Sequence, residues 1–143
     1  AFIPRMPFNQ HLGLRVTSVH RDGITIECPL RPELMNGAGV LHGGVTATMA
    51  DVAVGLAIQR HFGRLTPITT VELKVNFFRP IPSGKLSARS HLIRVGTRLC
   101  VGRVDLFDAQ RKLAGAALVT YILLEPSGAA GWAGRPGGGP VSG

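Results

Sequence analysis

Six stretches of the chain are predicted to be β-strands, and in two of them, residues 14–19 and 68–78, apolar and polar residues alternate as in a strand with one buried face. Two of the six come early, at residues 14–19 and 24–30, and the sequence Arg21-Asp22-Gly23 between them predicts a hairpin. The other four lie in the second half of the chain, separated by turn sequences, and we expect them to form an antiparallel meander. These four stretches are residues 68–78, 85–95, 98–107 and 113–124.

The longest apolar run is helical rather than alternating. Between Gly43 and Ile58 there is no proline and a single charged residue, Asp51. A helix that is apolar on nearly every side belongs inside a fold. Small or weakly polar residues recur in it at intervals of four and three and so form one stripe, the small-residue stripe: Gly44, Thr48, Asp51, Gly55 and Gln59. One sheet covers only one side of such a helix, so we expect this stripe to face a second copy of the chain.

These elements predict an α+β fold in which one long central helix is wrapped by a curved antiparallel sheet. We place this domain at residues 14–124. The first 13 residues contain Pro4 and Pro7, and we expect them to be irregular. Residues 125–143 are rich in glycine, proline and alanine and predict a flexible tail, with Trp132 as a loosely held aromatic residue.

Composition narrows the class of protein. A chain of 143 residues with 45% hydrophobic and 17% charged residues is typical of a single globular domain. Its net charge of +8 favours anionic partners such as nucleic acid, anionic lipid or a phosphorylated small molecule. The basic residues are dispersed and poorly interleaved with aromatic residues, so we do not expect nucleic acid to be the main partner.

The apolar runs, the start of the chain and the two cysteines bear on location and metal binding. No apolar run approaches the roughly 18 residues of a membrane span, and the start of the chain lacks the pattern of a secretory signal. We therefore expect no membrane partner. Cys28 and Cys100 lie in strand-like apolar surroundings without metal-ligand spacing. We expect a reduced, cytoplasmic protein without a metal site.

Asp51 is the first candidate for chemistry, because no cation lies three or four residues from it on the predicted helix. A carboxylate in such apolar surroundings is costly to ionise unless it is paired or hydrogen-bonded. Asp51 is therefore either a base or nucleophile or a structural residue that holds a backbone turn or a distant arginine.

The start of the helix is the second candidate. Gly43 and Gly44 leave backbone N–H groups at the positive end of the helix dipole, which is a ready oxyanion hole or anion site, or simply a tight turn. Asp51 follows Gly43 by eight positions, about 12 Å along a helix. No single carbonyl group reaches both. If the two groups act together, one subunit supplies the amide and another the acid, at a dimer interface.

The motifs resemble one known family. Asn36, the LHGG sequence at residues 41–44, Asp51 and the sequence VELKVNFFRP at residues 71–80 are similar to the hotdog-fold acyl-CoA thioesterases of the phenylacetate-pathway (PaaI-like) group, within the 4-hydroxybenzoyl-CoA thioesterase superfamily. The resemblance covers roughly residues 8–124. It implies the hotdog fold, a homodimer that forms the active site and pairs into a homotetramer, and hydrolysis of an acyl-CoA to the free acid and CoA. No cofactor is implied, because coenzyme A is part of the substrate.

The resemblance also implies roles for individual residues. Asp51 is the general base or nucleophile, and the Gly43 N–H of the partner subunit polarises the thioester carbonyl. Asn36 places the substrate or the attacking water, and His42 shapes the loop and hydrogen-bonds near the thioester.

A hydroxyl on the neighbouring strand supports the acid, and the match points to Thr70, with Thr69 as the alternative. The phosphates of coenzyme A are expected near two turns and the helix start, at Gly44, Arg79, Pro80, Arg94, Gly96, Thr97 and Arg98. Arginine suits phosphate because its donors form a planar fork.

Two alternatives share the fold. One is an enoyl-thioester hydratase or dehydratase, but the proline-rich loop usual around its histidine is absent, since His42 is followed by two glycines. The other is a non-catalytic acyl-CoA-binding protein, against which the presence of Asn36, Gly43 and Asp51 argues.

Overall fold

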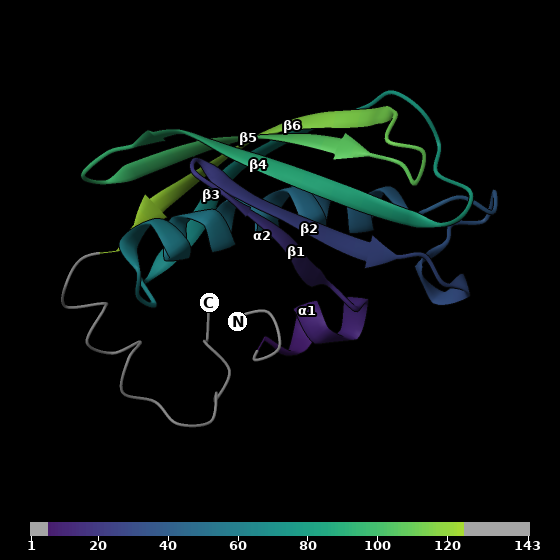
Figure 1. Ribbon diagram of the computed structural model, residues 1–143, viewed down its shortest axis with the longest axis horizontal. Coiled ribbons are helices and arrows are strands. Elements are labelled where there is room, and N and C mark those ends of the chain that lie inside the picture. Colours follow the sequence, from purple (N-terminus) through teal and green to yellow (C-terminus); the bar gives the residue numbers. More distant parts are fainter. Residues whose placement is uncertain (1–5, 125–143) are drawn as a thin grey trace.

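One long helix packs under one face of a curved, six-stranded antiparallel sheet in the computed structural model, which describes residues 6–124 (Figure 1). The expected tail at residues 125–143, with Trp132, lies outside the described residues. The helices and strands are, in chain order, α1 Pro7–Leu12, β1 Arg15–His20, β2 Gly23–Pro29, the 3₁₀ turn η2 Pro32–Leu34, α2 Gly43–Phe62, β3 Ile68–Phe77, β4 Lys85–Val95, β5 Leu99–Phe107 and β6 Leu113–Leu123.

The expectation of an irregular N-terminal segment was wrong for residues 7–12, which form α1. Pro7 stands in the first turn of this helix, where its missing N–H group costs nothing. Gly13 ends the helix with a left-handed backbone, φ 73°. The two prolines that argued against a helix therefore include the residue that begins one.

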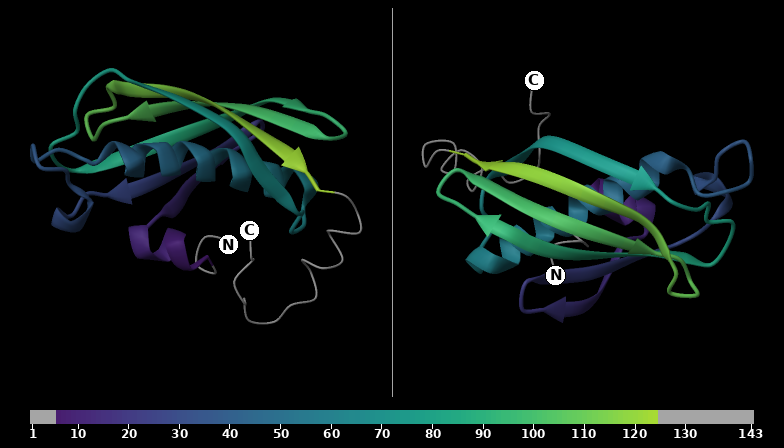
Figure 2. Two further views of the ribbon diagram at one scale, coloured as in Figure 1. Left: turned by 180° about the vertical axis from the view of Figure 1, so that it is seen from behind. Right: turned by 90° about the horizontal axis from the view of Figure 1, so that it is seen from above.

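The four strands after α2 do not form a simple meander. The sheet order is β1-β2-β4-β5-β6-β3, so β3 pairs with β6 at the far edge and β4 lies between β2 and β5 (Figure 2). Residues 78–84, with Pro80 and Pro82, do not close a hairpin, because β3 and β4 are not neighbours in the sheet. This segment instead crosses beside the start of α2, where the Leu41 N–H donates to the carbonyl of buried Ile81 at 2.8 Å. The crossing brings residues 79–81 to the glycine-rich loop.

The core lies between α2 and the concave face of the sheet. Met49, Val54 and Ile58 of the helix are fully buried. They pack with equally buried strand residues in one cluster, and burial of this apolar area drives folding. The strand members include Ile26, Leu86, Val104, Leu106 and Val119.

The small-residue stripe divides into two halves. Gly44, Thr48 and Asp51 are exposed or half-buried, so the chain itself leaves this half of the stripe open. Gly55 and Gln59 are buried by their own chain, against the expectation. A Cβ at Gly55 would meet the Tyr121 side chain, and the Gln59 amide donates to the Thr66 carbonyl at 2.7 Å. The sequence period showed that these residues share a face but not how far β6 and the segment after α2 cover it.

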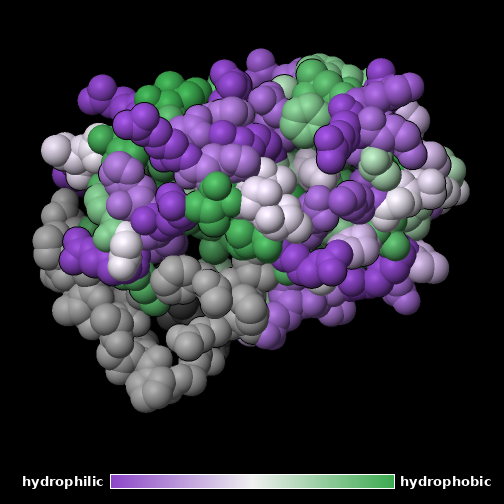
Figure 3. All heavy atoms as spheres, viewed as in Figure 1, coloured by the Kyte–Doolittle hydropathy of each residue, from purple (hydrophilic) through white to green (hydrophobic). Residues whose placement is uncertain are grey.

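Cys28 and Cys100 are both buried and unpaired, on β2 and β5. Among the helices of residues 6–124, none is long and apolar enough to cross a membrane. The face seen in Figure 3 is mainly hydrophilic, with its apolar side chains in small separate patches.

Candidate active site

The Asp51 carboxylate sits midway along α2 and is tied to β3. The Thr70 hydroxyl donates a hydrogen bond to Asp51 Oδ1 at 2.7 Å. Thr70 lies opposite Tyr121 in the β3–β6 ladder and faces the helix, whereas Thr69 lies opposite Ile122 and faces the other way. The hydroxyl on the acid is therefore that of Thr70. Asp51 is half-buried rather than enclosed, so its carboxylate keeps an open side.

Tyr121 is a neighbour of Asp51 that the sequence analysis missed. Its hydroxyl donates to the main-chain carbonyl of Asp51 at 2.8 Å. Burial raises the pKa of Tyr121 far above its usual range, and the charge of Asp51 acts in the same direction. The alternation of β6 places this tyrosine on the buried face, but nothing local in the sequence indicates which helix residue it reaches.

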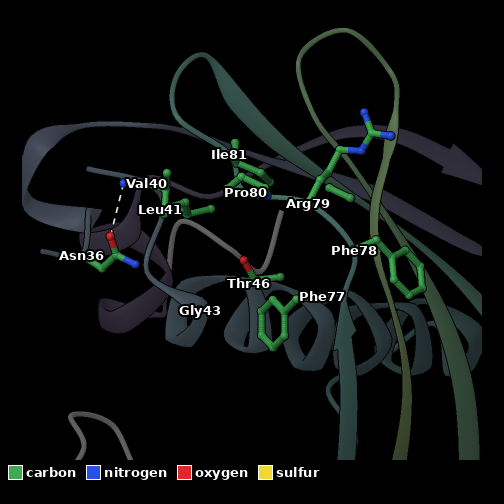
Figure 4. A pocket seen from close by; sticks show the side chains of 11 residues that line it. Asn36, Val40, Leu41, Gly43, Thr46, Phe77, Phe78, Arg79, Pro80 and Ile81 are labelled. Carbon is green, nitrogen blue, oxygen red and sulfur yellow. Dashed lines mark hydrogen bonds between the residues drawn. The ribbon is translucent and has the colours of Figure 1, made fainter. Parts of the chain in front are cut away.

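Asn36 organises the glycine-rich loop before the helix. Its Oδ1 accepts hydrogen bonds from the backbone N–H groups of Ala38 at 2.9 Å and Val40 at 3.2 Å, the second of which is drawn in Figure 4. The main-chain N–H of Asn36 donates to the Val40 carbonyl at 2.8 Å. Because the side-chain oxygen is occupied, the carboxamide nitrogen is the group of Asn36 that remains to bind a ligand.

His42 caps the helix and removes one of the two expected amide donors. Its Nδ1 accepts the Gly44 N–H at 2.8 Å, so a neutral His42 carries its proton on Nε2. Gly43 is the first helical residue, and its N–H has no hydrogen-bond partner among residues 6–124. The expectation of two open amides was therefore half right: the candidate oxyanion donor is Gly43 alone.

A cavity of about 400 Å³ opens at this end of α2 (Figure 4). A Cβ built on Gly43 would lie 3.4 Å from the Phe77 ring, so the ring packs directly beside the free amide. The walls combine apolar residues with two residues that carry polar side chains, Asn36 and Arg79, and the guanidinium of Arg79 extends away from the other lining side chains (Figure 4). The lining residues are Asn36, Val40, Leu41, Gly43, Thr46, Phe77, Phe78, Arg79, Pro80, Ile81 and Ala114.

The residues expected to bind phosphate lie in two places. Gly44, Arg79 and Pro80 are at the N-terminal end of α2 or at the end of β3. Arg94, Gly96, Thr97 and Arg98 are at the β4–β5 turn, where the Arg98 carbonyl accepts the Leu123 N–H at 2.6 Å.

Leu123 pairs with Ile68 at the start of β3, so these two groups lie at opposite ends of that strand. Ten residues of strand span about 33 Å. One chain therefore does not bring the two groups together.

Asp51 is likewise separate from the cavity and is not among its lining residues. Asp51 and Gly43 belong to one continuous helix, and eight positions at about 1.5 Å each put them about 12 Å apart. The structure thus assembles two half-sites on each chain: the Asp51–Thr70 pair, and the cavity with the Gly43 amide. Residues 6–124 contain no cluster of His, Cys, Asp and Glu residues suited to a metal ion.

This fold and these half-sites belong to a known class. Residues 38–114 match the family model of the thioesterase superfamily, and the chain is a member of that superfamily. The chain is 29% identical over 137 residues to the medium/long-chain acyl-CoA thioesterase YigI of Escherichia coli K12, covering 85% of this chain and 88% of that protein. It is 30% identical, with the same coverage, to the protein of that name from Salmonella typhimurium.

Solved structures agree with this assignment. The chain superposes on the thioesterase HI1161 of Haemophilus influenzae with a TM-score of 0.77 and 28% identity, covering 81% of each chain. A putative esterase from Mycobacterium tuberculosis gives a TM-score of 0.78 and 26% identity, covering 84% of this chain and 98% of that one. The fold is the hotdog fold, as expected, and the protein is a thioester hydrolase.

Proposed function

We propose that this thioester hydrolase cleaves an acyl-CoA to the free acid and CoA, in a site built by two copies of the chain. The observation that carries the proposal is the pair of separated half-sites: a hydroxyl-bound carboxylate in the middle of α2 and an unpaired amide at its start. The names of the relatives support acyl-CoA as the substrate. The net charge of +8 also suits a ligand that carries phosphates.

The proposed chemistry assigns one task to each half-site. As a base, Asp51 takes a proton from a water whose oxygen bonds to the thioester carbon, and as a nucleophile it attacks that carbon itself. The Gly43 N–H, at the positive end of α2, stabilises the negative charge that develops on the carbonyl oxygen. The carbon–sulfur bond then breaks. In the first case the free acid leaves and the proton held by Asp51 passes to the thiolate of CoA; in the second case an acyl–Asp51 anhydride remains, the thiolate takes a proton from water, and a further water hydrolyses the anhydride to the free acid. The carboxamide nitrogen of Asn36 helps to place the substrate or the water.

The edge strand β3 supports the dimer. It is ten residues long, its outer edge has no neighbouring strand within residues 6–124, and its exposed apolar residues include Val71 and Phe77, at 53% and 57% exposure. A long apolar edge of this kind is a template for pairing with another strand. We propose that two copies pair through β3.

The geometry of α2 and β3 fits such a dimer. Asp51 lies beside Thr70 near one end of β3, and Gly43 lies beside Phe77 at the other end. A twofold axis through the middle of β3 would exchange these ends and bring Asp51 of one copy to Gly43 of the other, giving two sites per dimer. The same axis would bring Arg79 of one copy toward the β4–β5 turn of the other, which would join the two phosphate-binding groups.

The proposal extends to the family subgroup and the larger assembly. The spacing of Asn36, the LHGG sequence and Asp51 supports the PaaI-like group, and with it a homotetramer of two such dimers. Buried, unpaired Cys28 and Cys100 fit a reducing cytoplasmic setting.

Release of free thiol tests the function. Short-chain, medium-chain, long-chain and aromatic acyl-CoAs are incubated with wild type, Asp51→Ala and Asp51→Asn, and with Asp105→Asn as a control carboxylate on the opposite face of the sheet. We expect thiol release by wild type and the control, and its loss in both Asp51 variants. Equal release by all four proteins would refute the role of Asp51. Hydration of an enoyl-CoA without thiol release would indicate a hydratase, and CoA binding without turnover a binding protein.

A further inference from the structure

Tyr121 connects the sheet to the helical turn that carries Asp51. Tyr121 is 7% exposed, and its hydroxyl donates to the Asp51 carbonyl at 2.8 Å. In an α-helix that carbonyl also accepts the N–H of residue 55, so the tyrosine supplies a second donor to it. We propose that Tyr121 is a positioning residue for the Asp51 carboxylate, and that residue 55 is glycine to give the tyrosine hydroxyl its place.

The two polar groups of Asp51 are held by one cross-strand pair. Thr70 of β3 and Tyr121 of β6 lie directly opposite each other in the sheet and both face α2. Thr70 holds the carboxylate and Tyr121 holds the main-chain carbonyl of the same residue. Two anchors on adjacent strands restrict how far the helical turn can shift or rotate against the sheet. A catalytic carboxylate benefits from such support because its geometry must be fixed before the substrate binds.

Gly55 is explained by the same contact. A Cβ built at this position would lie 2.7 Å from the Tyr121 hydroxyl oxygen and 3.2 Å from Cζ. Glycine inside a helix is destabilising relative to alanine, so its presence in the middle of α2 needs a reason. The reason is the close approach of the tyrosine: an alanine methyl group would push the hydroxyl away from the Asp51 carbonyl.

The tyrosine is suited to act as a permanent donor. Its burial, aided by the charge of Asp51 and opposed by the Thr70 hydroxyl, raises the pKa of the phenol. The hydroxyl therefore keeps its proton at neutral pH, where a carboxylate is ionised.

Steady-state thiol release by Tyr121→Phe tests this inference, which rests on the proposed role of Asp51. We expect kcat to fall about 10- to 100-fold, because small misplacements of a catalytic group have effects of that size. The KM is expected to stay within about twofold, since the hydroxyl does not face the substrate. Val119→Ala is the matched control: Val119 lies on the same face of β6 and is fully buried, but it touches neither Asp51 nor Thr70 through a hydrogen bond. Val119→Ala should lower the melting temperature and leave kcat unchanged.

A second variant tests the geometry without removing the hydroxyl. Gly55→Ala should lower kcat about as much as Tyr121→Phe. The double variant should be no slower than Tyr121→Phe alone, because the same hydrogen bond cannot be lost twice. Wild-type kcat in Tyr121→Phe, or a double variant whose loss is the product of the single losses, would overturn the inference. If Asp51→Ala were fully active, the proposed function would fail instead; an inactive Asp51→Ala with an unaffected Tyr121→Phe would refute this inference alone.

Discussion

The Thr70 hydroxyl lies 2.7 Å from the Asp51 carboxylate and is the side-chain link between β3 and the middle of α2. Two segments that are 19 positions apart in the chain meet at this bond, across the turn that ends α2. The bond leaves part of the carboxylate open, since Asp51 is only half-buried. It therefore fixes the direction of the acid without blocking it.

Thr70→Val removes this donor while keeping the shape of the side chain. A hydrogen bond to a charged group contributes about 1.5–3 kcal/mol. If all of that energy stabilises the transition state, its loss lowers kcat roughly 10- to 100-fold. Thr70→Ser keeps the hydroxyl and should retain most of the activity. Thr69→Val is the matched control, because its side chain faces away from the helix. Equal rates for Thr69→Val and Thr70→Val in the thiol assay would contradict the role of the bond.

Gly43→Pro removes the proposed oxyanion donor and little else. Gly43 is the first residue of α2, where proline fits a helix. His42 before it has ψ 131°, which is the extended conformation that a residue preceding proline favours. We expect kcat to fall about 10²- to 10³-fold, as for the loss of other oxyanion donors. The thermal stability should stay close to that of wild type.

The control for this variant is Gly43→Ala, which keeps the N–H. Its Cβ would lie 3.4 Å from the Phe77 ring, an ordinary contact. Gly43→Ala should therefore keep most of the activity, and similar losses in the alanine and proline variants would mean that crowding of the cavity, and not the amide, limits the rate.

The sequence predicted those parts of the fold that depend on local periodicity. The alternation in residues 68–78 and the apolar run after Gly43 correspond closely to β3 and α2. The position of β3 in the sheet was not predictable in this way. It depends on the crossing of residues 78–84 over the start of α2, which is held by the contact between Leu41 and Ile81. Nothing in the alternation of a strand shows which neighbour it will have.

The candidate site divides in the same manner. Asp51 was recognisable because it is the one charged residue between Gly43 and Ile58, and Gly43 because it begins the helix. The hydrogen bond from the Gly44 N–H to His42 could not be predicted from the sequence, because it depends on the rotamer of the histidine side chain. Tyr121 follows Asp51 by 70 positions, and only the register of β6 against β3 shows that it reaches the same residue as Thr70. Contacts set by register are the ones that sequence patterns leave open.

Acid stability should depend on Asp22, at the β1–β2 turn. Its carboxylate pairs with Arg89 at 2.6 Å and with Nδ1 of His91 at 2.9 Å. These hydrogen bonds lower the pKa of Asp22 from its usual 3.8 to about 2. Because the pKa of Asp22 is lower in the folded protein, its carboxylate stabilises the fold fully at pH values above 3.8, the pKa in the unfolded chain. That stabilisation is lost as the pH falls through about 2. Because Asp22 is half-exposed, we expect at most about 1 kcal/mol.

Asp22→Asn should therefore flatten the dependence of stability on pH within that acid window. Urea unfolding of both proteins at neutral pH and inside the window measures the difference. Identical slopes in wild type and Asp22→Asn would show that the two pairs contribute nothing to acid stability.

Mixed dimers test whether the two half-sites come from different chains. Asp51→Ala lacks the acid and Gly43→Pro lacks the amide, so each homodimer should be inactive. In a mixed dimer, one site combines the intact Asp51 of one chain with the intact Gly43 of the other, and the second site carries both defects. Random exchange makes half of the dimers mixed, so roughly a quarter of wild-type activity should return.

Co-expression with two different affinity tags isolates the mixed dimers, and a mixture of Asp51→Ala with Asp51→Asn serves as the control that should stay inactive. If mixed dimers form and thiol release does not return, the acid and the amide do not act across the interface, since no other pairing of these chains leaves both groups intact at one site.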